Sequence, residues 1–422
     1  MANEFPTREA IESLQLERLR GLLTQIHPAN SFYARKLDCT DSRISSLHDF
    51  SARFPFTTKQ ELVEDQTANP PFGSNRTYPI ERYSRFVQTS GTTREPLRWL
   101  DTTEDWRWMV TSWKTIYQAA GVTAKDRIYF AFSFGPFIGF WLAFDAAQMI
   151  GCLGIPGGGL SSAARLRAIN DNRATVLCCT PSYAIRLGEV AAQEDISTES
   201  IRLLIVAGEP GGSIPATRRK IEQLWPKARV FDHHGMTETG PVTFECPAQP
   251  GILHVIESAY VAEILSPEGN PVKRGEPGEL ILTPLGRAGA PLLRYKTGDM
   301  VKAVVAQPCK CGRFDLALQG GILGRIDEML VVRGVNVYPT AFEDLLRNFP
   351  QIAEFQIEVD KTKALAELRL QVEPIDESAP NLADDIQTVI QDTFHLRVPV
   401  TIVASGTLPR FEMKAKRWKV RS

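Results

Sequence analysis

The sequence carries almost no excess charge of either sign, few cysteines and no long apolar run. Lysine and arginine together number 48 and aspartate and glutamate 49, which gives a formal net charge of −1. This balance argues against a strongly basic surface for nucleic acid. A membrane span needs about 18 or more consecutive apolar residues, and the chain has no such run. Its polar first residues lack the basic and apolar regions of a secretory signal. We therefore expect a cytoplasmic protein that binds neither nucleic acid nor a membrane.

The composition is that of a globular protein. Of 422 residues, 43% are hydrophobic and 23% are charged, so about two to three domains with a sizeable core are expected. Seven cysteines do not make a disulfide scaffold in a chain of this length. Cys178 and Cys179 lie in an apolar run, where buried, inert thiols are the simplest interpretation.

Apolar periodicity predicts a layered α/β architecture in the first part of the chain. An amphipathic helix is expected over residues 8–26. Further on, short apolar runs alternate with helical patterns, which is typical of an α/β sheet. The expected strands are 85–88, 97–100, 128–132, 175–179, 203–207 and 229–231, and the expected helices are 161–170, 183–194 and 214–224. We expect Ser213 to cap the last of these helices, with Pro215 in its first turn.

The pattern changes after about residue 245. Short strands at 263–265, 279–283 and 300–305, separated by turns, predict a β-rich subdomain at about 245–323. A small α+β unit follows, with expected helices at 340–348 and 384–394 and expected strands at 329–332, 354–359, 366–372 and, last in the chain, 396–403. The expected fold is therefore α/β, with a large layered N-terminal domain at 1–325 and a small α+β C-terminal domain at 326–422.

Two segments of the large domain combine hydroxyl, glycine and carboxylate groups beside expected strands. Thr89-Ser90-Gly91-Thr92-Thr93-Arg94-Glu95-Pro96 offers hydroxyls and backbone N–H groups that suit a polyphosphate, although an ordinary turn has a similar composition. Asp232-His233-His234-Gly235-Met236-Thr237-Glu238-Thr239-Gly240-Pro241 follows a strand at the edge where α/β sheets place ligands. This second segment could hold a phosphate and Mg²⁺, or it is a polar loop.

Three later segments carry further polar candidates. Leu293-Arg294-Tyr295-Lys296-Thr297-Gly298-Asp299 ends in a carboxylate that could accept both hydroxyls of a ribose, or it forms a β-turn. The segment from Gly324 to Pro339 lies at the expected domain boundary. The segment from Leu408 to Arg417 carries Lys414 close to the C-terminus, where a lysine is usually a solvated charge.

The order and spacing of these five segments resemble the signatures of the adenylate-forming superfamily, which contains acyl-CoA synthetases, adenylation domains of peptide synthetases and luciferases. More narrowly, the chain resembles the phenylacetate–CoA ligase branch. The resemblance runs from about residue 10 to residue 417. The segments that carry this narrower resemblance are Phe54-Pro-Phe-Thr-Thr-Lys59, Ile155-Pro-Gly-Gly-Gly159, Ala207-Gly-Glu-Pro210 and Cys309-Lys-Cys-Gly-Arg313.

The resemblance implies a ligase that works in two steps. A carboxylate attacks the α-phosphate of ATP and expels pyrophosphate, and a thiol, usually of CoA, then displaces AMP from the acyl-adenylate. Between the steps the small C-terminal domain rotates about a hinge, which the resemblance places at Asp327. An aryl acid such as phenylacetate is the implied substrate and a homodimer the implied assembly. Transfer to a carrier protein or an amine, and a non-catalytic nucleotide-binding paralogue, are the alternatives.

The resemblance also implies roles for individual residues. Thr237 would contact the α-phosphate, Glu238 would ligate Mg²⁺, and Asp299, with Arg325 beside it, would hold the ribose. Lys414 would neutralise the α-phosphate and carboxylate oxygens during adenylation. The segment Arg333–Tyr338 would enter the cleft beside the pantetheine arm in the second step. The β- and γ-phosphates would lie on Thr89, Ser90, Gly91, Thr92 and Thr93, and the adenine among Gly208, Glu209, Pro210, Asp232, His233, His234, Gly235 and Met236. Within that set, Asp232 would meet the exocyclic amine and His234 the face of the ring.

Four positions depart from the family pattern. The phosphate loop usually ends Gly-Lys-Pro, and here it ends Arg94-Glu95-Pro96. An acid therefore stands where a lysine would face triphosphate, unless Arg94 supplies the missing charge. Met413 replaces the usual glycine before Lys414, and His234 replaces the usual tyrosine, which keeps a flat stacking surface.

Three cysteines and one histidine of the β-rich part offer a metal site. Cys246, His254, Cys309 and Cys311 are the ligand set of a closed structural zinc site. From the spacing alone, a bound zinc ion and three reduced thiols without a metal are equally expected, because C-x-C is shorter than the common C-x-x-C. The resemblance favours zinc, because some members of the branch carry such a site.

The segment Phe130–Trp141 is rich in aromatic residues and glycine. The resemblance places it at the border of the carboxylic-acid pocket, with Phe134, Gly135 and Phe140 as candidates for its wall. An aromatic slot suits a flat aryl acid. A helix start packed into the core is the alternative for most of these residues.

Overall fold

The structure, a computed structural model, describes residues 5–27, 29–38, 40–89, 96–333, 335–360, 366–376, 381–411 and 414–421. Four helices come first along the chain: α1 (Arg8–Ile26), α2 (Ser31–Lys36), α3 (Leu47–Arg53) and α4 (Lys59–Ala68). The expected amphipathic helix has the predicted bounds, and it buries Ile11, Leu19, Leu22, Leu23 and Ile26. None of the helices described is both long and apolar enough to cross a bilayer.

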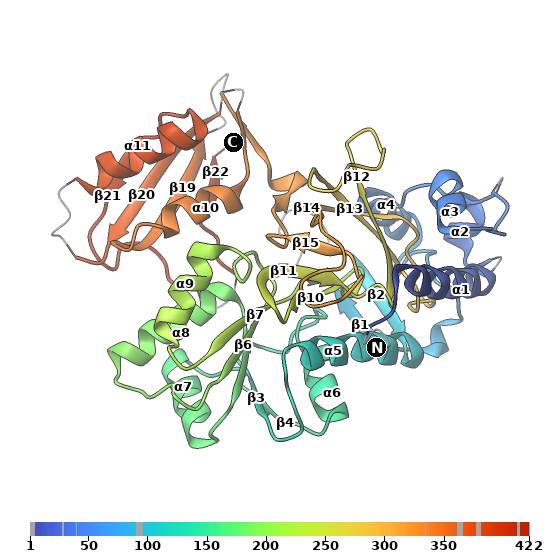
Figure 1. Cartoon of the computed structure of the whole chain (residues 1–422), viewed down its shortest axis with the longest axis horizontal. Coiled ribbons are helices and arrows are strands. Elements are labelled where there is room, and N and C mark those ends of the chain that lie inside the picture. Colours follow the sequence, from blue (N-terminus) through green and yellow to red (C-terminus); the bar gives the residue numbers. More distant parts are fainter. Residues whose placement is uncertain are drawn as a thin grey trace.

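A five-stranded parallel sheet forms the centre of the large domain, in the order β4-β3-β5-β6-β7. Its strands are β3 (Arg127–Phe130), β4 (Leu153–Pro156), β5 (Val176–Cys179), β6 (Leu203–Val206) and β7 (Arg229–Asp232). One face packs on α5 (Thr103–Ala119) and α6 (Trp141–Met149), and the other on α7 (Ser162–Asp171), α8 (Pro181–Gln193) and α9 (Pro215–Leu224) (Figure 1). Cys178 and Cys179 are fully buried on opposite faces of the sheet, as alternation along a strand requires.

Antiparallel sheets cover the rest of the large domain. A hairpin joins β1 (Tyr83–Gln88) to β2 (Arg98–Thr102) after the short 3-10 helix η1 (Ile80–Arg82), and β8 (Gly235–Met236) pairs with β9 (Gly240–Pro241). A three-stranded sheet contains β10 (Thr243–Cys246), β11 (Gln249–Val255) and β15 (Ala317–Gln319). A four-stranded sheet contains β12 (Tyr260–Leu265), β13 (Pro277–Pro284), β14 (Tyr295–Lys302) and β16 (Gly324–Arg325).

The C-terminal part has its own hydrophobic core, formed by residues between Val332 and Trp418. After η2 (Ile326–Glu328) come the pair β17 (Leu330–Val332) and β18 (Val335–Val337). A four-stranded sheet follows, made of β19 (Ile352–Asp360), β20 (Glu367–Pro374), β21 (Val400–Ile402) and β22 (Trp418–Arg421) in the order β21-β20-β19-β22. The helices α10 (Pro339–Arg347) and α11 (Leu382–Phe394) pack against this sheet. Helix α10 packs beside α9 of the large domain (Figure 1).

The predicted α/β fold class with a small α+β C-terminal domain is confirmed, and two local expectations were wrong. The strand predicted at 396–403 spans only Val400–Ile402. It is not the last strand of the chain, because β22 follows it and pairs parallel with β19. Helix α9 has Ile214 at its N-cap without a side-chain cap bond, since the Ser213 hydroxyl donates instead to Asp232 over 2.6 Å. The exact domain boundary at residue 325 stays a prediction.

Candidate active site

The segment after β7 brings polar side chains to the carboxyl edge of the parallel sheet. Asp232 ends β7 and is buried; its carboxylate accepts a hydrogen bond from Ser213. Burial raises the pKa of Asp232 to about 6, although Ser213 and Arg218 act in the opposite direction. A β-carbon on Gly212 would lie 2.5 Å from the carboxylate carbon, so only glycine lets the backbone approach here. Gly208 and Pro210 lie exposed beyond the end of β6.

His233 faces the opposite side of the sheet from Asp232, because successive residues of an extended chain alternate. Its ring lies edge-on to Trp113 of α5, with the ring centroids 4.4 Å apart. Both ring nitrogens are buried and have no hydrogen-bond partner among the described residues. Burial lowers the pKa of His233 to about 3, so the imidazole is neutral at pH 7.

His234, Asp299 and Arg325 form a chain of close polar contacts across three segments. The Nε2 atom of His234 lies 2.9 Å from Oδ2 of Asp299, which is buried on β14. The Arg325 guanidinium donates to the other oxygen, Oδ1, over 2.9 Å. Arg325 also donates to Asp327, over 2.9 Å, so the expected hinge residue is tied to the expected ribose site. The structure therefore brings these four predicted residues together.

A buried ion pair holds the backbone of Thr237 and Glu238. One guanidinium nitrogen of Arg287 donates to the carbonyl oxygens of both residues, each over 2.8 Å. The other two nitrogens pair with Asp101 of β2 over 2.6 and 3.0 Å, and both side chains are fully buried. The carboxylate of Glu238 lies 3.5 Å from the ammonium of Lys59, the first residue of α4.

Lys414 of the C-terminal domain lies beside Gly208. A β-carbon built on Gly208 would be 3.6 Å from Cε of Lys414. Glu209, predicted to line the adenine, has both carboxylate oxygens engaged. Oε1 accepts the backbone N–H of Ser182 and Oε2 that of Ala415, each over 2.8 Å.

The strand that enters the expected phosphate loop contacts the segment expected to border the acid pocket. Ser90, Gly91, Thr92, Thr93, Arg94 and Glu95 are outside the described residues, as is Met413. The backbone N–H of Gln88, next to Thr89, donates to the carbonyl of Pro136 over 2.6 Å. Of the wall candidates, Phe134 is half-buried and packs edge-on against Trp141, and the Gly135 carbonyl accepts the Trp141 indole N–H. Phe140 is buried and stacks on Phe132, with the centroids 4.1 Å apart.

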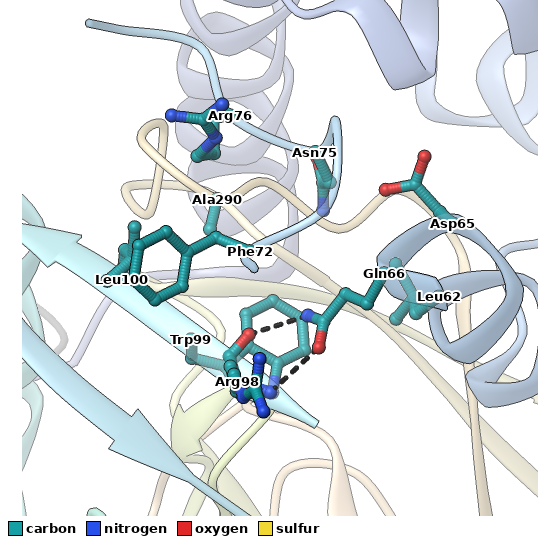
Figure 2. A pocket seen from close by; sticks show the side chains of 10 residues that line it. All are labelled: Leu62, Asp65, Gln66, Phe72, Asn75, Arg76, Arg98, Trp99, Leu100 and Ala290. Carbon is teal, nitrogen blue, oxygen red and sulfur yellow. Dashed lines mark hydrogen bonds between the residues drawn. The ribbon is translucent and has the colours of Figure 1, made fainter. Parts of the chain in front are cut away.

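A small cavity lies between α4 and β2 (Figure 2). Its volume of about 10 Å³ is too small for a substrate. At its edge the Gln66 amide pairs with both backbone groups of Arg98, donating to the carbonyl over 2.7 Å and accepting the N–H over 3.0 Å (Figure 2). These bonds fix the strand that leaves the phosphate loop.

The predicted metal ligands lie together in the β-rich subdomain. The ligand atoms of Cys246, His254, Cys309 and Cys311 all lie within 4.8 Å of one another. The Sγ atoms of Cys246 and Cys309 are 3.7 Å apart, and Sγ of Cys311 is 3.4 Å from Nε2 of His254. In a tetrahedron with zinc-to-ligand bonds of ordinary length, these separations would be about 3.8 and 3.5 Å. Burial lowers the pKa of His254 to about 4, which leaves a neutral imidazole.

Sequence reasoning missed the residues that support the site from outside the motifs. Lys59 belongs to the segment Phe54–Lys59, which carries part of the family resemblance, but its position in the sequence does not indicate that it lies near Glu238. Arg287 and Asp101 are 186 positions apart and belong to no motif. Their pairing depends on the tertiary structure, so the sequence gives no signal for it.

Two family models match the chain: "AMP-binding enzyme" over residues 60–284 and "AMP-binding enzyme C-terminal domain" over residues 334–419. The fold and these matches define the class, because the first model alone spans more than half of the chain. The protein is an enzyme of the AMP-binding class, a ligase.

A relative gives the narrower family. The phenylacetate-coenzyme A ligase of Thermus thermophilus is 31% identical over 434 residues, which cover 96% of this chain and 95% of the relative. The chain therefore belongs to the family of the phenylacetate-coenzyme A ligases, and the predicted family is confirmed.

Two solved structures of one ligase bear on the domain arrangement. 2-Hydroxyisobutyryl-CoA ligase in the postadenylation state, in complex with 2-HIB-AMP, has a TM-score of 0.92 to this chain at 28% identity, covering 99% of this chain and 90% of that chain. The same ligase with 2-HIB-AMP and CoA, in the thioesterification state, has a TM-score of 0.74 at 27% identity, covering 98% and 90%. The C-terminal part of this chain is therefore placed as in the first structure.

Proposed function

We propose that the protein activates an aryl carboxylic acid with ATP and transfers the acyl group to CoA, releasing pyrophosphate and then AMP. The observation that carries the proposal is the position of Lys414 beside Gly208, at the edge that also holds Asp232. A lysine brought there by a second domain supplies positive charge where an anionic acid and an anionic phosphate have to meet.

The nucleotide would lie along the polar chain of contacts. Asp299 offers two carboxylate oxygens to the ribose hydroxyls, and these would displace the nearby Nε2 of His234 from Oδ2. His234 would then lie against the adenine face, and Asp232 would accept a hydrogen bond from the exocyclic amine. Arg325 would stay on Asp299 and face the α-phosphate side. The backbone of Gly208 to Pro210 would line the adenine.

The phosphates would lie toward Thr237 and Glu238. Thr237 would contact the α-phosphate, and the loop from Thr89 to Thr93 would hold the β- and γ-phosphates. Glu238 has a carboxylate, the kind of ligand Mg²⁺ prefers, and its backbone is fixed by Arg287. When bound, Mg²⁺ supplies charge neutralisation to the phosphates. Lys59 would supply a positive charge near the phosphates, because the phosphate loop has the acidic Glu95 where the family pattern has a lysine.

The acid would lie between the phosphate loop and the aromatic segment. Phe134, Gly135 and Phe140 stay candidates for the pocket wall, with Trp113 and His233 on the opposite side. Aromatic faces suit a flat aryl group. For the second step, Asp327 would be the hinge and Arg333–Tyr338 the segment that faces the pantetheine arm of CoA.

The test is pyrophosphate release with ATP and Mg²⁺ across a panel of aryl and straight-chain acids, each with and without CoA. We expect acid-dependent release that is greatest for aryl acids and increases with CoA as the enzyme turns over. Release that CoA leaves unchanged would favour a carrier-protein thiol or an amine as acceptor. No release with any acid would contradict the proposed function.

We also propose that Cys246, His254, Cys309 and Cys311 hold a structural zinc ion. The support is the clustering of four ligand atoms at tetrahedral separations. Zinc there would tie the β10–β11 hairpin to the loop that contains Cys309. Elemental analysis should find about one zinc per chain, and replacing Cys309 and Cys311 together by serine should remove it and lower the thermal midpoint. Fewer than about one zinc per ten chains in the native protein would refute the site.

The homodimer and the cytoplasmic location stay predictions. Light scattering after gel filtration tests the first: a mass twice that of the 47.0 kDa chain is expected. A mass equal to that of one chain would refute it.

A further inference from the structure

Glu209 joins the two domains at the residue that follows Lys414. It lies three residues after the end of β6 in the large domain, and its Oε2 accepts the backbone N–H of Ala415 over 2.8 Å. Its Oε1 accepts the backbone N–H of Ser182 over 2.8 Å. Both oxygens of one carboxylate therefore bind backbone N–H groups, one in each domain.

The large-domain end of this bridge is rigid. Ser182 is the second residue of α8, whose N-terminus carries a partial positive charge that favours a carboxylate. Thr180 caps the same helix, and its hydroxyl accepts the N–H of Tyr183 over 3.2 Å. Glu209 is thus held in place before it meets the C-terminal domain.

The C-terminal end of the bridge belongs to the segment that carries the ammonium group. Lys414 is exposed, and its aliphatic chain lies next to Gly208, the residue before Glu209. Arg417, three residues further on, is anchored inside its own domain by Glu354 over 2.7 Å. Arg417 also lies 3.4 Å from the Ser182 hydroxyl, so the same N-terminal turn of α8 receives a second contact from this segment.

We infer that Glu209 is a positioning residue that holds Lys414 in the nucleotide cleft for acyl-adenylate formation and releases Ala415 before thioester formation. The inference rests on the proposed function and adds a residue that biases the equilibrium between the two domain arrangements. Any rotation of the C-terminal domain away from α8 breaks the bond to Ala415 and leaves the bond to Ser182 intact. The carboxylate is thus available to form the bond again after each turnover.

Two substitutions of Glu209 distinguish the double hydrogen bond to the two backbones from the negative charge of the side chain. Glu209→Gln keeps the length but replaces one acceptor oxygen with an NH₂ group, so only one of the two N–H groups can be satisfied. Glu209→Asp keeps the charge but is one methylene shorter, so it cannot reach both N–H groups. Glu194→Gln is the matched control, because Glu194 lies exposed at the other end of α8.

The two half-reactions are measured separately, with acyl-adenylate formation followed by pyrophosphate release and thioester formation started from supplied acyl-adenylate. Both Glu209 variants should slow the first about ten-fold, which is the worth of one hydrogen bond to a charged group. Thioester formation should be unchanged or faster. Equal slowing of both half-reactions, or wild-type adenylation in either variant, would overturn the inference.

Hydrogen exchange of the peptide that contains Ala415 tests the same bond without catalysis. Exchange should be faster in both Glu209 variants than in the wild type and the Glu194→Gln control. Unchanged exchange would refute the bridge even if the wild type proved to be an active ligase. An inactive wild type with faster exchange in the variants would instead refute the proposed function and keep the bridge.

Discussion

Replacing Arg287 by methionine is the perturbation whose cost the structure defines best. The guanidinium is fully buried and makes four polar contacts, two with the Asp101 carboxylate and two with the carbonyls of Thr237 and Glu238. It also lies over the indole of Trp99, 5.0 Å from the ring centroid. Methionine fills similar space but offers none of these donors.

The main cost comes from the Asp101 charge that remains. Breaking a fully buried pair by removing one partner costs about 3–5 kcal/mol, because the other charge stays in a medium of low polarity. This is a large share of a domain's total stability of about 5–15 kcal/mol. We expect the thermal midpoint to fall by roughly 5–10 °C. We also expect a second, separate loss of activity, because Arg287 no longer holds the carbonyls of Thr237 and Glu238, the residues proposed to meet the α-phosphate and Mg²⁺.

A double variant distinguishes the two losses. Replacing Asp101 by leucine in the Arg287→Met background removes the unpaired charge, so calorimetry should show most of the stability restored. Acid-dependent pyrophosphate release should nevertheless stay about 10–100-fold below the wild type, since displaced groups in a reacting site cost this much. Recovery of the rate together with the stability would refute the positioning role of Arg287.

Three further substitutions test other parts of the account. Lys59→Met should raise the KM for ATP several-fold and leave the KM for the acid unchanged, because the ammonium lies beside Glu238, where we propose that the phosphates bind. An unchanged KM for ATP would show that the phosphates lie elsewhere. His233→Leu should leave activity toward unsubstituted aryl acids within about three-fold of the wild type and lower activity toward hydroxylated aryl acids by about ten-fold or more. The reason is that the neutral imidazole of His233 offers a hydrogen-bond donor and an acceptor. An equal loss for both kinds of acid would contradict a role of His233 in binding a hydroxyl group. Glu373→Gln should lower the thermal midpoint at pH 7. Burial raises the pKa of Glu373, but hydrogen bonds from Arg410, Gly406 and Leu408 outweigh it and lower this pKa to about 2. The ionised carboxylate therefore stabilises the folded state by about 3 kcal/mol, a contribution that is complete above pH 4.5 and is lost as the pH falls toward 2. Wild type and variant with parallel stability profiles from pH 7 to pH 2 would contradict this.

The fold was predictable where periodicity and length agree. Helix α1 and strands β5, β6 and β7 have nearly the expected bounds, because each is a regular apolar pattern next to polar residues. The short strand β22 was missed, because it depends on pairing with β19, more than 50 residues earlier in the chain. Ser213 was mistaken for a helix cap because the sequence does not show that a buried carboxylate competes for its hydroxyl.

The candidate site was predictable through its motifs and not through the contacts between them. The predicted residues Asp232, His234, Asp299, Arg325 and Lys414 come from four distant segments. The structure joins His234, Asp299 and Arg325 by direct contacts and places Lys414 beside Gly208. Glu209 stays a predicted adenine-lining residue. Its side chain also accepts hydrogen bonds from the backbones of Ser182 and Ala415, which only the three-dimensional structure shows. The residues Ser90 to Glu95 are outside the described part, so the altered phosphate loop stays a prediction from sequence.

The most direct test of the central claim follows both half-reactions in one sample of the protein. The enzyme is mixed with ATP, Mg²⁺ and phenylacetate in the absence of CoA, and the products are identified by mass spectrometry before and after CoA is added. The account predicts enzyme-bound acyl-adenylate first, then its conversion to the acyl-CoA with release of AMP. In Lys414→Ala no acyl-adenylate should form, while supplied acyl-adenylate should still react with CoA. Absence of acyl-adenylate with phenylacetate and with every other acid of the panel, or its formation at the wild-type rate in Lys414→Ala, would contradict the account.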